Sequence, residues 1–159
     1  MLAACDTGSQ RRFNQDELDL ERRRREPRRI KESEIIEAGL QQGQSMVAFL
    51  QLNSQPPGSS CCPQVPPSLL DSLRNQHQAN IMCYSLRDGK AAAKSRLEQE
   101  LLEAYRYSAE QNMPLETNIQ AEGNEYFIFT APATNGAATK IPCAIWSIRL
   151  SRKEIVLNM

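Results

Sequence analysis

The clearest hydrophobic pattern in the sequence is an alternation near its C-terminal end. From residue 144 onward, every second side chain is apolar, and the residues between them form a mixed set. The apolar set is Ala144, Trp146, Ile148 and Leu150. A period of two predicts a β-strand with one buried face. Ser151 and Glu154 have the spacing of a capping box, which predicts a short helix over residues 152–158.

Helical periodicity predicts three more helices upstream of this strand. In residues 33–53 the apolar positions recur on one face, and Ser33 is the expected N-cap. A short helix is expected to begin with Ser68 as its cap. The strongest pattern covers residues 90–112, where alanines favour the helix and leucines recur along one stripe.

Three further segments alternate in the manner of strands. They are residues 80–86, 117–121 and 125–131. The last two flank a Glu-Gly-Asn turn, so we expect a hairpin, and short connections favour antiparallel neighbours. The predicted fold class is therefore α+β. We expect a PAS-like antiparallel sheet of about four strands, with N-terminal helices and one long helix packed on one side of it.

Composition and charge divide the chain into a tether and a domain. The sequence has 159 residues, 40% of them hydrophobic, and no net charge, which suits a single domain with a modest core. No run of about 18 apolar residues is present that could span a membrane. We interpret residues 1–32 as a lipoprotein-like N-terminus with a basic linker, and residues 33–159 as the folded domain.

The N-terminal residues resemble those of a bacterial lipoprotein. Small residues precede Cys5, as they precede the lipidated cysteine of that class. The arginines of residues 22–29 either face anionic headgroups or belong to a solvated linker, and no aromatic residues lie among them to indicate nucleic acid. We therefore expect lipid anchoring through Cys5 on the periplasmic side of the envelope. If the match at Cys5 is chance, the chain is cytoplasmic.

The cysteines allow redox chemistry but no evident metal site. Their spacing fits no zinc motif and His77 is the single histidine, so we expect no metal. Cys83 and Cys143 lie in or beside predicted strands, and a disulfide between them is expected if these strands pair in an oxidising compartment. A thiol redox protein that uses Cys61, Cys62, Cys83 or Cys143 is an alternative, although the Cys-x-x-Cys motif that lowers a thiol pKa is missing.

Several short motifs between Ser68 and Ile155 together resemble one family, over about the last 120 residues of the chain. The motifs are Ser-Leu-Leu-Asp-Ser-Leu at 68–73, Tyr-Ser-Leu-Arg at 84–87, Glu-Leu-Leu-Glu-Ala-Tyr at 100–105 and Ile-Trp-Ser-Ile at 145–148. With them the chain resembles the PAS-like c-type haem domain family of unknown function, whose members are periplasmic or lipoprotein-anchored, alone or as sensor modules. The family's Cys-x-x-Cys-His motif is replaced by residues 132–140, which hold neither cysteine nor histidine. The resemblance therefore implies a member without covalent haem.

These observations favour a binding domain over an enzyme. No histidine lies near a nucleophile and no glycine-rich phosphate loop is present, so we expect no catalytic residues and no cofactor. We expect an envelope-anchored, sensor-type domain that binds a small ligand or a partner protein, with a pocket between the sheet and its helices. The expected lining residues are Cys62, Met82, Tyr84, Tyr105, Phe127, Phe129 and Trp146.

Overall fold

The computed structural model describes residues 14–25, 29–55, 61–87, 93–134 and 142–159. Its contacts divide the chain into two compact units, Met1–Ile30 and Lys31–Met159. The described part of the first unit is one exposed helix, α1 (Gln15–Arg25), with acidic residues in its first turn and arginines in its last. Negative charges near the N-terminus and positive charges near the C-terminus interact favourably with the helix dipole and stabilise the helix.

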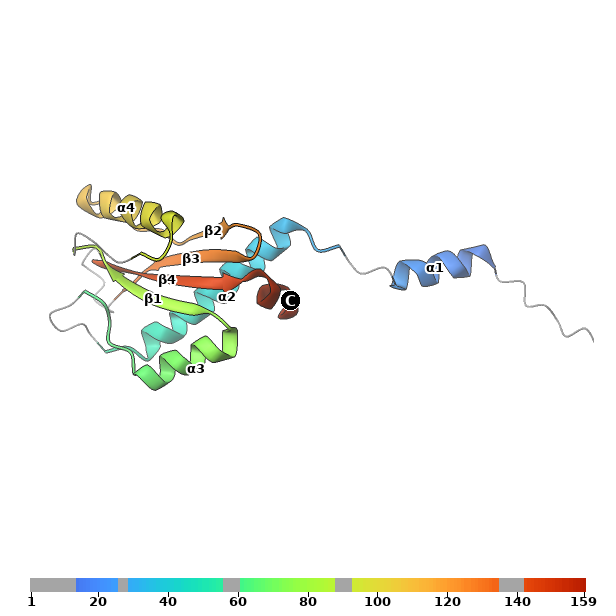
Figure 1. Ribbon diagram of the computed structural model, residues 1–159, viewed down its shortest axis with the longest axis horizontal. Coiled ribbons are helices and arrows are strands. Elements are labelled where there is room, and N and C mark those ends of the chain that lie inside the picture. Colours follow the sequence, from blue (N-terminus) through green and yellow to red (C-terminus); the bar gives the residue numbers. More distant parts are fainter. Residues whose placement is uncertain (1–13, 26–28, 56–60, 88–92, 135–141) are drawn as a thin grey trace, which may run out of the picture. The chain divides into compact units, whose positions relative to one another are not determined.

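The second unit is built on a four-stranded antiparallel sheet with the strand order β1-β4-β3-β2 (Figure 1). The strands are β1 (Asn80–Ser85), β2 (Asn118–Glu122), β3 (Tyr126–Pro132) and β4 (Ala144–Ser151). All three pairings are antiparallel, and β2 and β3 form the expected hairpin. The α+β class and the antiparallel sheet of four strands are therefore confirmed.

Strand β4 is buried on both faces, so the prediction of one buried face was wrong. Trp146 on the expected face is 2% exposed, but Ile145 and Ser147 on the opposite face are only 0% and 4% exposed. The reason is position, because β4 lies between β1 and β3 and helices cover both sides of the sheet. Arg149 and Ser151, at the end of the opposite face, are partly exposed.

One layer of helices covers the apolar face of the sheet. It consists of α2 (Glu32–Leu52), α3 (Pro67–His77) and α5 (Arg152–Leu157). Helix α2 approaches β3 so closely that a Cβ on Gly43 would lie 2.4 Å from the Phe129 ring. Glycine is therefore required here by the close contact between helix and sheet. No helix among the described residues has the length and apolarity needed to span a bilayer.

The long helix α4 (Arg96–Glu110) lies on the opposite face, which corrects the expectation that all helices share one side (Figure 1). Its Leu102 and Tyr105 pack with Tyr84 of β1 and Ile145 of β4. In the β3–β4 register Ile148 pairs with Phe129, so Ile145 points away from the face that α2 covers. The sheet is thus sandwiched between two helical layers.

None of the three expected serine caps forms a side-chain capping hydrogen bond. Ser33 and Ser68 lie inside their helices, which begin after Lys31 and Pro66. Ser151 is the N-cap of α5 but makes no side-chain capping hydrogen bond. In α3 a proline at the first helical position supplies a backbone that is already helical, so a serine cap is not needed. A serine side-chain cap does form at α4, where Ser95 is the N-cap residue.

Candidate functional site

A small polar cavity lies between the first turn of α4 and the sheet. Its volume is about 10 Å³, which is close to the space that one water molecule needs. Ser95 brings the helix to this point, because its hydroxyl accepts a hydrogen bond from the Glu98 amide at 3.2 Å. The lining residues are Asn80, Met82, Lys94, Ser95, Glu98, Glu122, Ser147 and Arg149. A metabolite does not fit into this space.

Glu98 and Tyr84 are two of the buried polar side chains on this side of the sheet. Glu98 is 7% exposed and Tyr84 5% exposed. Neither the Oε1 atom of Glu98 nor the Tyr84 hydroxyl has a hydrogen bond of standard geometry among the described residues. Burial, followed by the nearby Glu98 carboxylate, raises the pKa of Tyr84 well above its ordinary value. Tyr84 therefore stays protonated at neutral pH and is no nucleophile.

Arg149 is engaged on the rim of the same cavity. Its Nη2 atom lies 2.7 Å from Oε1 of Glu122, and its guanidinium lies 4.1 Å from the centroid of the Tyr126 ring. The arginine side chain is 41% exposed, and that of Glu122 20% exposed. An ion pair and a cation–π contact hold the guanidinium in one position on the sheet. These contacts join β2 to β3 and β4, so we assign Arg149 a structural role.

An open groove lies at the other end of α4. Its volume is about 300 Å³. One wall is the side of α4 that carries Leu101, Tyr105 and Ser108, and the other is the segment that leads into β2, an edge strand of the sheet. The lining residues are Leu101, Ala104, Tyr105, Ser108, Pro114, Leu115, Glu116, Thr117 and Asn118. We call these residues the α4–β2 groove. Its apolar floor beside an unpaired strand edge suits a polypeptide better than a small polar molecule.

Tyr105 fixes the wall of this groove. Its hydroxyl lies 2.5 Å from the carbonyl oxygen of Glu116 and 2.9 Å from Oγ1 of Thr130. These contacts connect α4 with β3 and with the chain before β2. Burial raises the pKa of Tyr105, although its hydrogen bond with Thr130 acts in the opposite direction. Periodicity identified Tyr105 as an apolar helix position, whereas the hydrogen-bonding partners of its hydroxyl depend on tertiary contacts.

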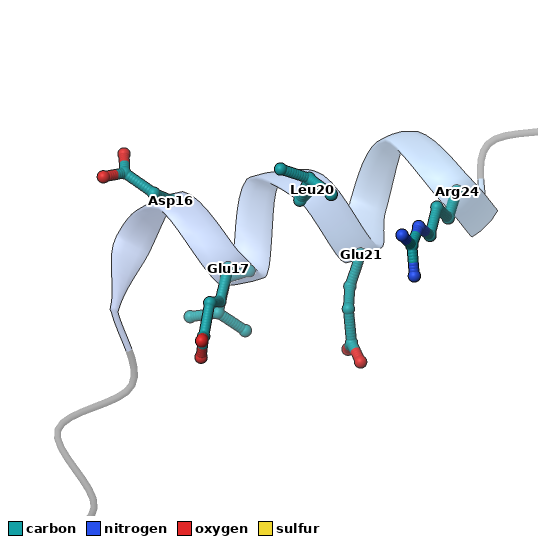
Figure 2. A pocket seen from close by; sticks show the side chains of 6 residues that line it. Asp16, Glu17, Leu20, Glu21 and Arg24 are labelled. Atoms are coloured by element: carbon teal, nitrogen blue, oxygen red, sulfur yellow. The ribbon is translucent and has the colours of Figure 1, made fainter.

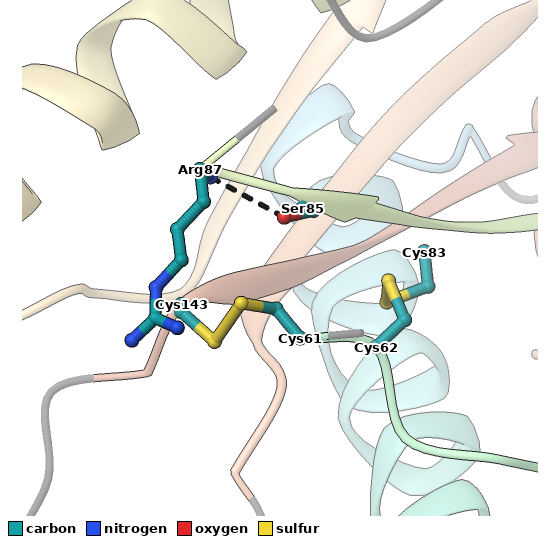
Figure 3. Close-up of a disulfide and its surroundings, with 6 residues drawn as sticks. All are labelled: Cys61, Cys62, Cys83, Ser85, Arg87 and Cys143. Atoms are coloured by element: carbon teal, nitrogen blue, oxygen red, sulfur yellow. Dashed lines mark hydrogen bonds between the residues drawn. A yellow bond between two sulfur atoms is a disulfide. The ribbon is translucent and has the colours of Figure 1, made fainter. Parts of the chain in front are cut away.

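Two disulfides join the segment after α2 to the sheet (Figure 3). Cys61 is bonded to Cys143, with 5.5 Å between the Cα atoms, and Cys62 is bonded to Cys83, with 6.0 Å. The expected bond between Cys83 and Cys143 was therefore wrong. The strands do pair, but Cys83 lies opposite Trp146, whereas the Leu86 amide donates to the Cys143 carbonyl. The two cysteines are thus offset along the strands.

The seven residues expected to line one pocket are distributed over both faces of the sheet. Met82, Tyr84 and Tyr105 are on the α4 side. The two phenylalanines, Phe127 and Phe129, and Trp146 are on the α2 side, where they are 1%, 0% and 2% exposed and fill the core. Cys62 is used in a disulfide. These seven side chains therefore do not share a cavity, because the sheet itself separates them.

A further hollow lies along α1 in the first unit (Figure 2). Its lining residues all come from this one helix, and all of them are exposed. They are Asp16, Glu17, Leu18, Leu20, Glu21 and Arg24. One helix surface has no opposing wall that could enclose a ligand, so this hollow is no binding site by itself. Cys5, the expected lipid anchor, lies outside the described residues.

Metal-ligating side chains do not gather within the described ranges. No group of three or more His, Cys, Asp or Glu side chains there has the arrangement to hold a metal ion. His77, at the end of α3, lies with its Nδ1 atom 3.3 Å from Nε2 of Gln42 in α2. The contact joins two helices of one layer, and this gives the histidine a structural explanation.

Comparisons of the chain with protein-family models, with curated proteins and with solved structures give no match. The resemblance to the PAS-like c-type haem domain family therefore stays a prediction, carried only by the short motifs of the sequence. Function has to be argued from the geometry of this chain. The features that bear on it are the filled core, the α4–β2 groove and the two disulfides.

Proposed function

We propose that this chain is a non-enzymatic, sensor-type binding domain of the bacterial envelope, tethered through Cys5, and that it recognises a partner protein. This function would suit a haem-less relative of the PAS-like c-type haem domain family. The observation that carries the proposal is the filled interior. Where a small-molecule sensor has a cavity between sheet and helices, the described core of this chain has packed side chains.

In the part of the chain that the structure describes, the interior is packed too tightly to hold a metabolite. The three largest aromatic side chains under α2 are at most 2% exposed. On the α4 side, the polar cavity of about 10 Å³ accepts a single water molecule. Ligand pockets typically have volumes of about 300 to 1,000 Å³. Recognition therefore falls to the surface, where the α4–β2 groove, of about 300 Å³ and open to solvent, lies beside the edge strand β2.

The two disulfides support the proposed compartment. Structural disulfides persist in oxidising environments such as the bacterial periplasm and are rare in the cytosol. Here two of them link the segment after α2 to β1 and to the start of β4. The arginines at the end of α1 are exposed and lie C-terminal to Cys5, where they would meet anionic headgroups if that cysteine is lipidated.

The thiol redox alternative has less support. The four cysteines are paired between parts of the chain that are distant in sequence. The bonded cysteines are separated by 82 residues in one disulfide and by 21 residues in the other. Catalytic disulfides instead join two cysteines in a short motif at a helix N-terminus, where the thiolate is stabilised. The pairing here is the arrangement of a structural clamp, so we do not propose redox catalysis.

Site-specific photo-crosslinking in living cells tests the proposal. A photoreactive amino acid replaces Ser108 or Thr117, which line the α4–β2 groove. We expect a discrete adduct of higher mass, with one protein, from both positions. The matched control is Ser72, an exposed residue of α3 on the other side of the sheet, which should give none.

Two results would contradict the proposal. One is the absence of any adduct from the groove positions while the protein is folded and exported. The other is a small molecule that copurifies in a one-to-one complex, detected by native mass spectrometry, because the packed core then opens to accept a ligand. A cytoplasmic location of the full-length protein would contradict the proposed envelope location, independently of partner binding.

A further inference from the structure

The cysteines can be paired in more than one way, and the native pairing is nested. Cys62–Cys83 lies inside the segment that Cys61–Cys143 closes. Four cysteines allow three pairings. A bond between the neighbours Cys61 and Cys62 is disfavoured, because consecutive Cα atoms are about 3.8 Å apart and disulfides usually need about 4.4 Å or more. What remains is the native pairing and one alternative, Cys61–Cys83 with Cys62–Cys143, which we call the swapped pairing.

Chain entropy does not distinguish these two pairings. The native bonds span 21 and 82 residues. In the swapped pairing one span is a single residue longer and the other a single residue shorter, because Cys61 and Cys62 are neighbours. The probability of closing a flexible loop falls as about the 3/2 power of its length, so each closure differs by a factor of about 1.1 or less. An unfolded chain should therefore form both pairings in nearly equal amounts.

The folded structure, in contrast, accepts only one pairing. Cys61 is 7% exposed and its sulfur faces Cys143, whereas Cys62 faces Cys83 on β1 (Figure 3). Cys83 lies opposite Trp146, and the Cys143 carbonyl accepts from the Leu86 amide at 2.7 Å, so the two targets are offset along the paired strands. To form the swapped bonds, the side chains of the adjacent residues Cys61 and Cys62 would have to exchange positions. A swapped chain is thus trapped outside the native fold.

We propose that this chain is a client of a thiol–disulfide isomerase in its oxidising compartment. The isomerase thiolate attacks Sγ of Cys83 in the swapped Cys61–Cys83 bond, forms a mixed disulfide and releases the Cys61 thiolate. Cys61 then attacks Sγ of Cys143 in the Cys62–Cys143 bond, which forms the native Cys61–Cys143 bond and releases the Cys62 thiolate. Cys62 attacks Cys83 in the mixed disulfide and regenerates the isomerase thiolate. Two disulfides are present before and after, so no oxidant or reductant is consumed.

The inference rests on the disulfide pairing and on the oxidising compartment proposed above, but it is independent of partner binding in the α4–β2 groove, so these two can fail separately. To test it, the chain with Cys5→Ser is oxidised in denaturant and then transferred to native buffer with glutathione, with or without a purified bacterial thiol–disulfide isomerase. Acid-quenched samples are separated by chromatography. Tandem mass spectrometry with backbone cleavage between Cys61 and Cys62 identifies each pairing.

We expect native and swapped chains within a factor of about 2 of each other in denaturant, since loop lengths are nearly equal. The isomerase should then speed conversion of the swapped form by at least about tenfold. The control variant, Cys5→Ser with Cys61→Ser and Cys143→Ser, retains only Cys62 and Cys83, and no pairing remains to be corrected. It is reduced and reoxidised in native buffer, and the isomerase should not accelerate formation of its single bond.

Three results would overturn the proposal. The first is a swapped form that is absent in denaturant, because the unfolded chain would then already select the native pairing. The second is conversion at the same rate with and without the isomerase. The third is equal acceleration of wild type and control, which would mean that the enzyme promotes oxidation rather than correction.

Discussion

The hydroxyl of Tyr105 lies 2.9 Å from Oγ1 of Thr130, and this contact fixes α4 on the sheet. Both side chains are buried, at 8% and 1% exposed. Helix α4 carries many charged residues and presents few apolar side chains to the sheet. A buried hydroxyl pair therefore sets where along β3 the helix lies, because loss of the contact would leave the buried Thr130 hydroxyl with only a long contact, 3.5 Å, to the Asn118 carbonyl oxygen.

Tyr105→Phe removes this contact together with the hydrogen bond to the Glu116 carbonyl. We expect a loss of about 1 to 3 kcal/mol in the free energy of unfolding, since Thr130 keeps a buried hydroxyl. Urea denaturation followed by circular dichroism measures the loss. Tyr107→Phe is the control on the same helix, because Tyr107 is 60% exposed, and its effect should be below about 0.5 kcal/mol. Equal effects of the two changes would contradict the assigned role.

Gly43→Ala tests the close approach of α2 to the sheet. The new Cβ would lie 2.4 to 2.7 Å from atoms of the Phe129 ring, which is fixed in the core. Alanine gains up to about 1 kcal/mol in helix propensity over glycine, but overpacking a core typically costs about 1 to 3 kcal/mol. We expect net destabilisation in urea denaturation. Gly39→Ala should be milder, because its closest contact, 2.9 Å, is the end of the flexible Ile119 side chain. Greater stability of Gly43→Ala would show that the ring can move.

The elements of the fold could be predicted from the sequence because each has a local pattern. The alternation in β3 and β4 and the stripe of α4 follow from one face being apolar. The layer that covers the second face could not be predicted, because Ile145 and Ser147 alternate in the same way whether solvent or a helix lies above them. The residue that belongs to this second layer despite its charge is Glu98. It lies at helical spacing from Leu101, Leu102 and Tyr105, on the side of α4 that faces the sheet.

Removal of each disulfide should destabilise the domain, and the longer loop should matter more. For separations of 82 and 21 residues, chain entropy gives about 4.5 and about 3.3 kcal/mol for the Cys61–Cys143 and Cys62–Cys83 bonds. Thermal unfolding of Cys61→Ala with Cys143→Ala, and of Cys62→Ala with Cys83→Ala, compares the two bonds. We expect both melting temperatures to fall, the first by more. An unchanged melting temperature in either variant would mean that the bond is absent or unimportant.

The partners of the cysteines could not be read from the sequence for a physical reason. Pairing depends on where separate strands bring the Cα atoms, and an offset of three residues along β1 decides between Cys83 and Leu86 as the neighbour of Cys143. The α4–β2 groove was missed for the same reason. Its wall depends on the hydroxyl of Tyr105, whose helical spacing indicated only a buried position.

Cys5→Ser tests the proposed tether. We expect the wild type, expressed with its native upstream region, to sediment with membranes, and the serine variant to be released. A single acyl chain binds membranes only marginally, so the acylated cysteine and the basic residues that follow it should act together, with the cysteine dominant. Fractionation and immunoblotting measure the partition, and Cys62→Ser with Cys83→Ser serves as the control that keeps the anchor. A serine variant that stays membrane-bound, or a soluble wild type, would contradict lipidation.

The buried Tyr84 hydroxyl should make the domain sensitive to alkaline pH. Burial and the neighbouring Glu98 carboxylate raise the pKa of Tyr84 in the folded state above its unfolded value of about 10. Below pH 10 the hydroxyl is protonated in both states, and its contribution to stability is fully present. As pH rises above 10, the unfolded chain loses this proton while the folded chain keeps it. The free energy of unfolding then falls, by at most about 1.4 kcal/mol per pH unit from this group.

Urea denaturation of the Cys5→Ser protein at pH 8 and pH 10.5 measures this loss, and the same pair of measurements on Tyr84→Phe isolates the contribution of the hydroxyl. We expect the phenylalanine variant to lose less stability between the two pH values than the parent. Part of the loss should remain in the variant, because burial also raises the pKa of Tyr105. Tyr107→Phe, which removes an exposed tyrosine hydroxyl, is the matched control. If parent and Tyr84→Phe lose the same stability, Tyr84 titrates alike in both states, and the packing of α4 over β1 is looser than the structure shows.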